Sequence, residues 1–204
     1  MKTWLRHQVA PLGFLFLLVL TFGIFIPWLG FYWDDWPVLL TGRLQGAPGF
    51  WQFYQYDRPV SAWTYVVTHP ILGENPVAWH LFTLLLRWLT TFFMWKTTTT
   101  LWPCHRPEAT WSAFLFAVYP VFTQQAISVA YSQHWLCFLL FFVSLYLMVL
   151  AWRTPGRFWL LTIISCAASL LGMFTMEYFV GLELLLQPYS GCWHLSSQTN
   201  VEIK

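Results

Sequence analysis

Long apolar stretches separated by short polar turns make up most of this chain of 204 residues. About 20 consecutive apolar residues are needed for a helix to cross the hydrocarbon layer of a bilayer. The pattern predicts five spans, the third of them short, and then a partial span: 9–29, 76–101, 110–126, 135–152, 158–175 and 178–188. A polar tail, 189–204, follows. We therefore predict an all-α fold, a polytopic transmembrane helix bundle built from residues 1–188.

The segment 30–75, between the first two spans, is rich in aromatic residues but repeatedly interrupted by glycine and proline. Breakers such as Gly46, Pro59 and Pro70 make it too broken to span a bilayer. Its apolar pieces, for example 50–56, suit short helices that lie in the plane of the lipid headgroups. We expect interfacial helices in a long first outer loop.

The N-terminus carries basic residues, Lys2 and Arg6, before its first apolar stretch. That stretch is about 20 residues long, whereas the apolar core of a cleaved signal peptide has about 7–15. A small-residue cleavage motif does not follow it. We interpret the first span as a retained signal anchor.

The composition supports a membrane protein and argues against nucleic acid as a partner. Hydrophobic residues make up 58% of the chain and charged residues only 9%, whereas soluble domains carry roughly 25% charged residues. The 15 Trp and 9 Tyr residues are typical of aromatic belts at the two membrane interfaces. The formal charge of +2 comes without a basic run, so the expected partner is the lipid bilayer.

The distribution of Lys and Arg predicts the orientation of the spans. If the spans alternate, six basic residues fall on one side, which is then cytoplasmic by the positive-inside rule: Lys2, Arg6, Lys96, Arg106, Arg153 and Arg157. The acidic pair Asp34-Asp35, a polar strip over 124–134 and Glu177 then share the opposite, extracytoplasmic face. Three separate polar insertions therefore converge on one side of the membrane.

Cysteine and histidine residues do not indicate a metal site. The four Cys residues show no CxxC spacing, and the six His residues show no HxxxH or HExxH pattern. Neither a zinc site nor a disulfide framework is therefore predicted.

The adjacent carboxylates Asp34 and Asp35 are the first candidate for chemistry. A charge beside a membrane span marks a functional site by default, although an acidic pair can simply mark the exit of a helix. On a helix the two side chains would point about 100° apart, so they would have different roles. Desolvation by Trp33 and Trp36 should raise a carboxylate pKa, as a general base near neutral pH requires.

Two arginines differ in what their positions predict. Arg58 lies on the same side as the acidic pair, where its guanidinium could bind a phosphate in bidentate fashion. The alternative is an ion pair between Arg58 and Asp57 or Asp34. Arg87 lies in the middle of the second span, so it should face the interior of the bundle, in a structural pairing rather than a catalytic role.

His134 and Glu177 complete the candidate site. His134 begins the fourth span at the outer face, and Glu177 follows the fifth span on the same side. We count both as candidate substrate-binding or phosphate-binding residues. The alternatives are an interfacial histidine and a carboxylate that merely ends a helix.

Several stretches together resemble the GT-C superfamily of membrane glycosyltransferases, in particular the protein mannosyltransferase-like members that use polyprenyl-phosphate sugars. The resemblance covers roughly residues 9–188 and depends on the order, spacing and shared sidedness of these motifs: Trp33-Asp34-Asp35-Trp36 after the signal anchor, Tyr56-Asp57-Arg58-Pro59-Val60-Ser61, Leu72-Gly73-Glu74-Asn75-Pro76 with Trp79-His80-Leu81, Phe116 to Phe122, and Met176-Glu177-Tyr178. Met176 stands where the family usually has Lys. The remaining spans of the family are missing, so the chain is expected to be an N-terminal part or a truncated form.

The resemblance implies transfer of a sugar from a polyprenyl-phosphate donor to an acceptor protein or glycan on the extracytoplasmic face. It implies that Asp34 or Asp35 activates the acceptor, while Arg58 and Glu177 line the donor-phosphate and acceptor cavity. Some members of the family use a divalent cation and others do not.

A different class of function is a catalytically inactive or truncated membrane scaffold or lipid-binding relative. A transporter ranks last, because its polar residues would lie at the middle of the bilayer on broken helices. The short loops favour the plasma membrane of a bacterium as the location.

Overall fold

The computed structural model describes residues 2–119, 126–177 and 180–181, with side chains from residue 9 onward. Every regular element within this part of the chain is a helix, as predicted. The helices whose bounds the described residues give follow one another: α1 (Lys2–Thr21), η1 (Gly23–Trp28), α2 (Asp35–Tyr54), α3 (Pro59–Leu72), α4 (Pro76–Leu101), η2 (Pro103–His105), α5 (Arg106–Ala117), α6 (Ser128–Arg153), η5 (Pro155–Arg157) and α7 (Phe158–Thr175).

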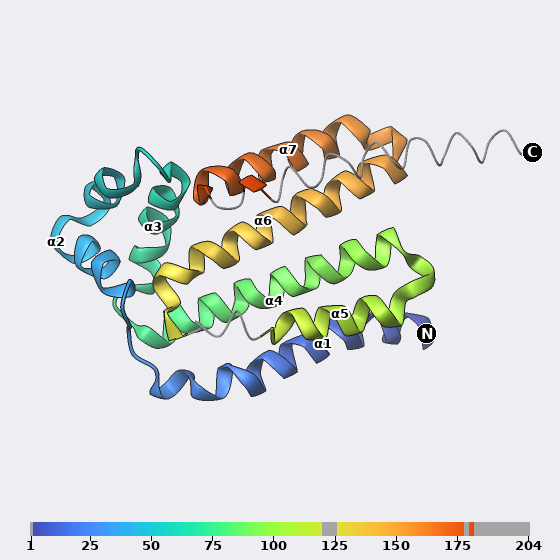
Figure 1. Ribbon diagram of the computed structural model, residues 1–204, viewed down its shortest axis with the longest axis horizontal. Coiled ribbons are helices and arrows are strands. Elements are labelled where there is room, and N and C mark those ends of the chain that lie inside the picture. Colours follow the sequence, from blue (N-terminus) through green and yellow to red (C-terminus); the bar gives the residue numbers. More distant parts are fainter. Residues whose placement is uncertain (1, 120–125, 178–179, 182–204) are drawn as a thin grey trace, which may run out of the picture.

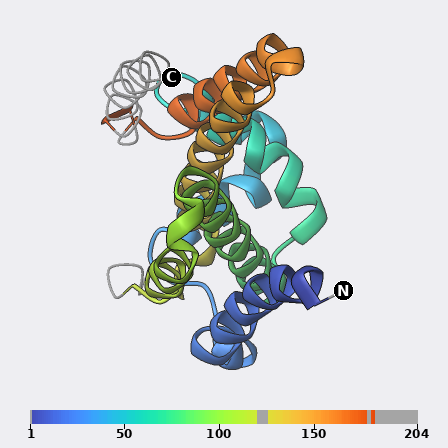
Figure 2. The same ribbon diagram turned by 90° about the vertical axis from the view of Figure 1, so that its right-hand side faces the viewer.

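The long helices lie side by side, with α4 near the middle (Figure 1). Helix α6 packs between α4 and α7, while α1 and α5 pack against the other flank of α4. Helices α2 and α3 pack on each other across one end of this bundle, as both views show (Figures 1 and 2). We call this the capped end of the bundle and the opposite end, where α1 begins, the far end.

In the part of the chain that the structure describes, four stretches are long and apolar enough to cross a membrane: Val9–Trp28, Pro76–Leu101, Ser128–Arg153 and Pro155–Thr175. Their outward faces carry large exposed apolar side chains, among them Phe16, Trp159 and Ile163. A helix satisfies its own backbone hydrogen bonds, which a segment inside a bilayer must do. By length and composition these helices suit a membrane protein.

The short helix α5 differs from the span predicted over 110–126. It contains 12 residues, and at 1.5 Å per residue it is about 18 Å long, whereas the hydrocarbon layer is about 30 Å thick. Residues 120–125 lie outside the described part of the chain. The partial span 178–188 and the tail 189–204 also lie almost entirely outside it.

Helix α6 begins at Ser128, seven residues before the predicted start at Trp135. The polar residues of its first turns therefore belong to the helix and not to a loop before it. The apolar pattern alone misplaced this start, because the N-terminus of α6 is capped by a side chain from elsewhere in the chain, as described below.

Helices α2 and α3 occupy the interrupted segment in which interfacial helices were predicted. Helix α2 contains a kink at Gly46, whose φ of +63° is a conformation that other residues rarely adopt. The sharp turn between α3 and α4 uses a second such glycine, Gly73, with φ +57°. The Asn75 side chain then caps α4 by accepting hydrogen bonds from the N–H groups of Val77 and Ala78.

Threonine side chains connect α4 to α6 at intervals of seven residues. The hydroxyls of three threonines on α4 donate to three carbonyls on α6: Thr83 to Ser128 at 2.9 Å, Thr90 to Trp135 at 3.3 Å and Thr97 to Phe142 at 3.4 Å. Each pair is separated by the same 45 positions in sequence, so the two helices run parallel in a constant register. Such hydroxyl-to-carbonyl contacts hold helices together where lipid removes the hydrophobic driving force.

Small residues and hydroxyl groups also hold α6 against α7. The Ser144 and Ser165 hydroxyls lie 3.1 Å apart, and the Ser165 hydroxyl also lies 2.8 Å from the Ser144 carbonyl oxygen. The Cys137 thiol contacts the Gly172 carbonyl oxygen at 3.6 Å. From Cys137 to Ser144 the residue number rises along α6, while from Gly172 to Ser165 it falls along α7. The two helices are therefore antiparallel.

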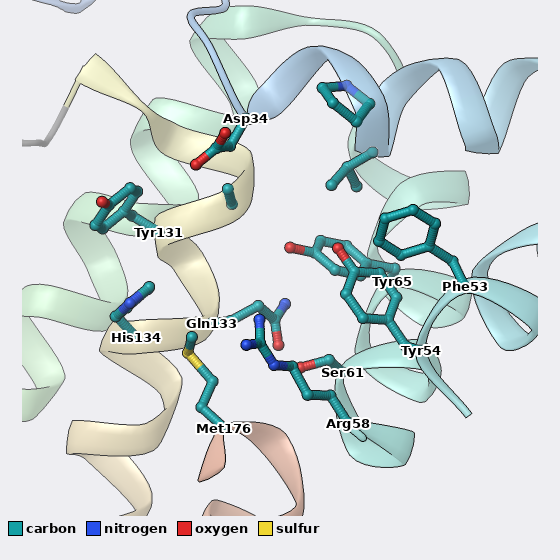
Figure 3. A pocket seen from close by; sticks show the side chains of 13 residues that line it. Asp34, Phe53, Tyr54, Arg58, Ser61, Tyr65, Tyr131, Gln133, His134 and Met176 are labelled. Atoms are coloured by element: carbon teal, nitrogen blue, oxygen red, sulfur yellow. The ribbon is translucent and has the colours of Figure 1, made fainter. Parts of the chain in front are cut away.

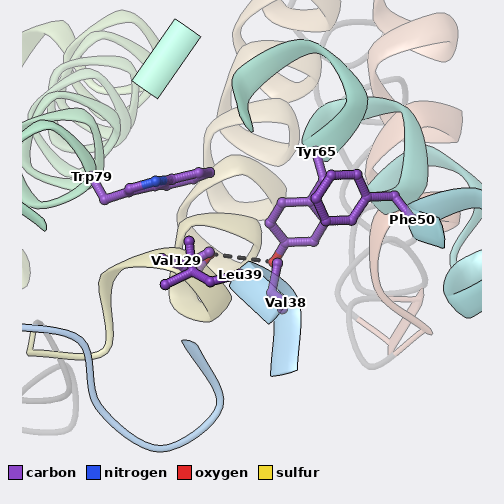
Figure 4. Close-up of a cluster of buried hydrophobic side chains, with 6 residues drawn as sticks. All are labelled: Val38, Leu39, Phe50, Tyr65, Trp79 and Val129. Carbon is purple, nitrogen blue, oxygen red and sulfur yellow. Dashed lines mark hydrogen bonds between the residues drawn. The ribbon is translucent and has the colours of Figure 1, made fainter. Parts of the chain in front are cut away.

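The largest apolar cluster lies beneath the capped end and joins α2 and α3 to the bundle (Figure 4). Tyr65 and Phe50 stack within it at a centroid distance of 5.6 Å. The Tyr65 hydroxyl donates to the Val129 carbonyl on α6 at 3.3 Å. Burial of such large aromatic side chains fixes the cap on the bundle.

Candidate functional site

A cavity of about 390 Å³ opens at the capped end, and three of the five predicted site residues line it. Asp34 and Arg58 lie on opposite sides of this cavity, with His134 between them on α6 (Figure 3). We call it the Asp34–Arg58 cavity. Its full lining is Asp34, Pro37, Val38, Phe53, Tyr54, Arg58, Ser61, Tyr65, Ala130, Tyr131, Gln133, His134 and Met176.

A tight turn over residues 32–35 separates the two neighbouring aspartates. Trp33 has a φ of +45°, which is uncommon for a residue with a side chain, and the Asp35 N–H donates to the Tyr32 carbonyl at 3.0 Å. Helix α2 begins immediately afterwards. Asp34, just outside the helix, borders the cavity, whereas Asp35, inside it, points into the protein.

The Asp35 carboxylate caps α6 from a distant part of the chain. Its oxygens accept hydrogen bonds from the backbone N–H groups of Ser128, Val129 and Ala130, at 3.1, 2.8 and 2.9 Å. These groups have no partner within their own helix, and a negative charge is favourable at this end of the helix dipole. Asp35 is fully buried. The arrangement gives it a structural task that Asp34 does not share.

Burial raises the pKa of Asp35 above its ordinary value, while the hydrogen bonds from Ala130, Tyr32, Val129 and Ser128 partly oppose that rise. The sequence predicted that desolvation raises the pKa of a carboxylate in the acidic pair, and Asp35 is a carboxylate whose pKa is raised in this way. Its oxygens are already engaged by backbone donors and do not line the cavity. Of the two carboxylates, Asp34 is the one placed to meet a molecule in the cavity.

Arg58, immediately before α3, forms a bidentate ion pair with Glu177, two residues after the end of α7. The Nε and Nη2 atoms of Arg58 lie 2.8 and 2.6 Å from the two carboxylate oxygens of Glu177. A contact to Asp57 is much longer, at 3.9 Å. The sequence offered Asp57 or Asp34 as an ion-pair partner for Arg58, and the short pair is instead with a residue 119 positions away.

The Ser61 side chain links the start of α3, next to Arg58, to the end of α7, near Glu177. Its hydroxyl is buried and donates to the Thr175 carbonyl at 2.7 Å, at the last residue of α7. The start of α3 and the end of α7 are thereby fixed beside each other, which brings Glu177 within reach of Arg58.

His134 faces the cavity from α6 and stacks on Tyr131, with ring centroids 4.5 Å apart and planes inclined by only 14°. Gln133, the preceding residue, accepts a hydrogen bond from the Thr64 hydroxyl at 2.9 Å. The polar strip predicted before the fourth span therefore supplies one wall of the cavity from within the helix.

The sequence reasoning missed the phenol groups of the site. Tyr54 and Tyr65 line the cavity and stack on each other at 5.5 Å. Burial raises the pKa of Tyr54 and raises that of Tyr65 well above its usual range, so both hydroxyls are protonated at neutral pH. The Tyr65 hydroxyl already donates its proton to the Val129 carbonyl. The signal was weak because the chain has so many aromatic residues that one more tyrosine is uninformative.

An apolar groove of about 340 Å³ adjoins the cavity. It lies between α3, α4 and α6, and residues such as Val67, Phe82 and Leu136 line it. Gln133 lines both the groove and the cavity, so its side chain, hydrogen-bonded to Thr64, stands between the two spaces. A cavity with charged side chains in its lining beside an apolar groove suits a ligand with a polar head and an apolar chain.

Arg87 lies inside the bundle, as predicted, and outside the cavity lining. Its Nε donates to the Ala117 carbonyl at the end of α5, at 2.9 Å. The guanidinium also lies over the Phe22 and Trp135 rings, 3.7 and 4.8 Å from their centroids. These contacts join α4 to α5, to α6 and to Phe22 between α1 and η1, and they support a structural role.

Among the described residues, groups of three or more His, Cys, Asp or Glu side chains that could hold a metal ion are absent. The divalent cation that some members of the resembling family use therefore has no evident set of ligands in this part of the chain.

Comparison of the chain with protein-family models, curated proteins and solved structures finds no match. The function is therefore inferred from the geometry of the site.

Proposed function

We propose that this chain is a membrane glycosyltransferase, or the N-terminal part of one, that uses a polyprenyl-phosphate-linked sugar as donor. One observation carries the proposal: a carboxylate, Asp34, and a guanidinium, Arg58, line opposite sides of the same cavity. The reaction needs a base for the acceptor and a cation for the leaving phosphate. The cavity offers one of each.

In the proposed reaction, Asp34 accepts the proton of an acceptor hydroxyl or amide as that group attacks C1 of the sugar. The bond between C1 and the phosphate oxygen breaks, and its electron pair leaves with the polyprenyl phosphate. Arg58 stabilises the charge that grows on this phosphate, because a guanidinium matches phosphate geometry in bidentate fashion. A single displacement of this kind inverts the configuration at C1.

Two further features support a lipid-linked donor at the extracytoplasmic face. The apolar groove beside the cavity suits the first part of a polyprenyl chain. Helix ends and turns rich in Lys and Arg lie at the far end, among them those bearing Arg106, Arg153 and Arg157. By the positive-inside rule that end is cytoplasmic, and the short turns there favour a bacterial plasma membrane.

The test is transfer of labelled sugar from polyprenyl-phosphate donors by the purified chain in lipid nanodiscs. Asp34→Asn should reduce transfer by about 10²- to 10⁴-fold, the usual contribution of a general base. Asp57→Asn is the matched control, because it removes a nearby carboxylate that does not line the cavity, and it should retain transfer. Equal activity of wild type and Asp34→Asn would contradict the assigned role of Asp34.

The second candidate function is a lipid-binding protein without catalysis, a scaffold or inactive relative. The observation that favours it is the ion pair with Glu177, which already satisfies the guanidinium of Arg58. Specific binding of polyprenyl phosphate by the wild-type chain, without transfer to any acceptor, would support this function over the enzyme.

A further inference from the structure

We propose that Glu177 is an internal occupant of the phosphate site at Arg58, and that the phosphate group of a lipid ligand displaces it. The inference rests on the proposed function for the identity of the ligand. It assigns Glu177 a regulatory role in place of a direct contact with the phosphate.

The geometry of the ion pair carries the inference. Both carboxylate oxygens of Glu177 meet the Nε and Nη2 atoms of Arg58, at 2.8 and 2.6 Å. A phosphate uses two oxygens at the same spacing on the same edge of a guanidinium. A carboxylate and a phosphate therefore compete for the Nε–Nη2 edge of Arg58, and a phosphate that binds this edge displaces Glu177.

The exposure of the pair makes this exchange feasible. The Glu177 side chain is 47% exposed and that of Arg58 is 23% exposed. Water can therefore solvate the released carboxylate, which lowers the cost of separating the pair relative to a buried one. The Asp35 carboxylate is the contrast, since it is fully buried on three backbone N–H groups and has no solvated position to move to.

The backbone before Glu177 places this residue outside α7. Helix α7 ends at Thr175, where the hydrogen bond from Ser61 fixes it, and Met176 has an extended backbone with φ −151° and ψ 124°. Glu177 is thus two residues beyond a fixed point and outside the helix. It can withdraw from Arg58 without moving α7.

The charges of donor and product indicate how Glu177 would affect the binding of each to Arg58. A sugar-linked polyprenyl phosphate is a diester with one negative charge, whereas the released polyprenyl phosphate is a monoester with about −1.5 to −2. The product would therefore bind Arg58 more tightly than the donor does. Glu177, by returning to Arg58, favours release of the product.

The experiment measures binding of a labelled polyprenyl monophosphate to the full chain in nanodiscs. Glu177→Gln should bind it about two- to fivefold more tightly than wild type, the range expected for loss of an exposed competing ion pair. Asp57→Asn is the matched control: it removes the same charge beside Arg58 but only a contact of 3.9 Å, and its affinity should change little. Arg58→Gln should lose binding.

Glu177→Asp provides a second variant, because it keeps the charge but is too short for the bidentate contact, and it should also bind more tightly. The proposal is overturned if neither Glu177 variant gains affinity, or if Asp57→Asn gains as much. Wild-type transfer with unchanged affinity in the Glu177 variants would reject the regulatory role alone. Absence of both binding and transfer in every variant would reject the proposed function as well.

Discussion

Asp34 and Asp35 show how one turn of the chain gives two neighbouring carboxylates different environments. The turn at Trp33 leaves Asp34 beside the cavity and sends Asp35 to the N-terminus of α6. The residues are identical in charge and adjacent in sequence. Their separation supports a division of labour, in which Asp34 is proposed for chemistry and Asp35 positions the helix that carries Gln133 and His134.

The first prediction concerns the stability that Asp35 provides. Asp35→Ala leaves the N–H groups of Ser128, Val129 and Ala130 without their acceptor and should lower the free energy of unfolding by about 1–3 kcal/mol. Asp35→Asn keeps one acceptor oxygen and should lose less. Thermal unfolding in detergent measures both, with Asp34→Ala as the control that leaves these bonds intact. Equal loss in Asp34→Ala and Asp35→Ala would show that the cap on α6 is not the cause.

At the scale of elements, polar contacts at regular spacing decide which helices pair and in which direction. The hydroxyls of Thr90 and Thr97 also lie 2.8 Å from carbonyls of their own helix, so their longer bonds to α6 are shared. Thr83, at 2.9 Å from the Ser128 carbonyl, makes the strongest of the three contacts. It also acts on the same end of α6 that Asp35 caps.

The second prediction follows from this contact. Thr83→Val keeps the shape of the side chain but removes the hydroxyl, and it should destabilise the protein by about 0.6 kcal/mol, with about 1.7 as an upper value. Thr98→Val is the matched control on the same helix, because the Thr98 hydroxyl donates only within α4, to Met94 and Trp95. Unfolding measurements that give Thr98→Val the larger loss would contradict the proposed importance of the contact with α6.

At the scale of the whole molecule, the site depends on the separation of two chemically different ends. The cavity, its carboxylate and its guanidinium lie at the capped end. The far end carries η2 and η5, with their neighbouring basic residues. If the bundle spans a membrane, the cavity lies at one face of that membrane and the basic turns lie at the other.

The third prediction tests this orientation. Cys104 is exposed in η2 at the far end, and in a Cys192→Ser background an impermeant maleimide should label it only from the cytoplasmic side of vesicles. A cysteine replacing Tyr56, which is 93% exposed near the cavity, should be labelled only from the other side once Cys104 and Cys192 are serine. Labelling of both positions from one side would rule out the proposed orientation.

The amino-acid sequence by itself determined the class of structure and the residues that share one end. Helix length, apolar composition and the placement of Lys and Arg are local properties, so they predicted helices of membrane-spanning length and put Asp34, Arg58, His134 and Glu177 on a common face. The structure brings the first three to one cavity and Glu177 to Arg58.

Only the tertiary structure decided what those residues contact. The cap of Asp35 on α6 joins residues more than 90 positions apart, and the pair between Arg58 and Glu177 joins residues 119 apart. Local pattern carries no information about such distant pairs. The local pattern also predicted too late a start for α6 and too long a helix for α5. Asp35 accepts a hydrogen bond from the first residue of α6, and Arg87 donates one to the last residue of α5, so both helix ends depend on side chains from distant parts of the chain. The physical reason is the same each time: a helix end or a charge must be satisfied by whichever group the fold brings to it.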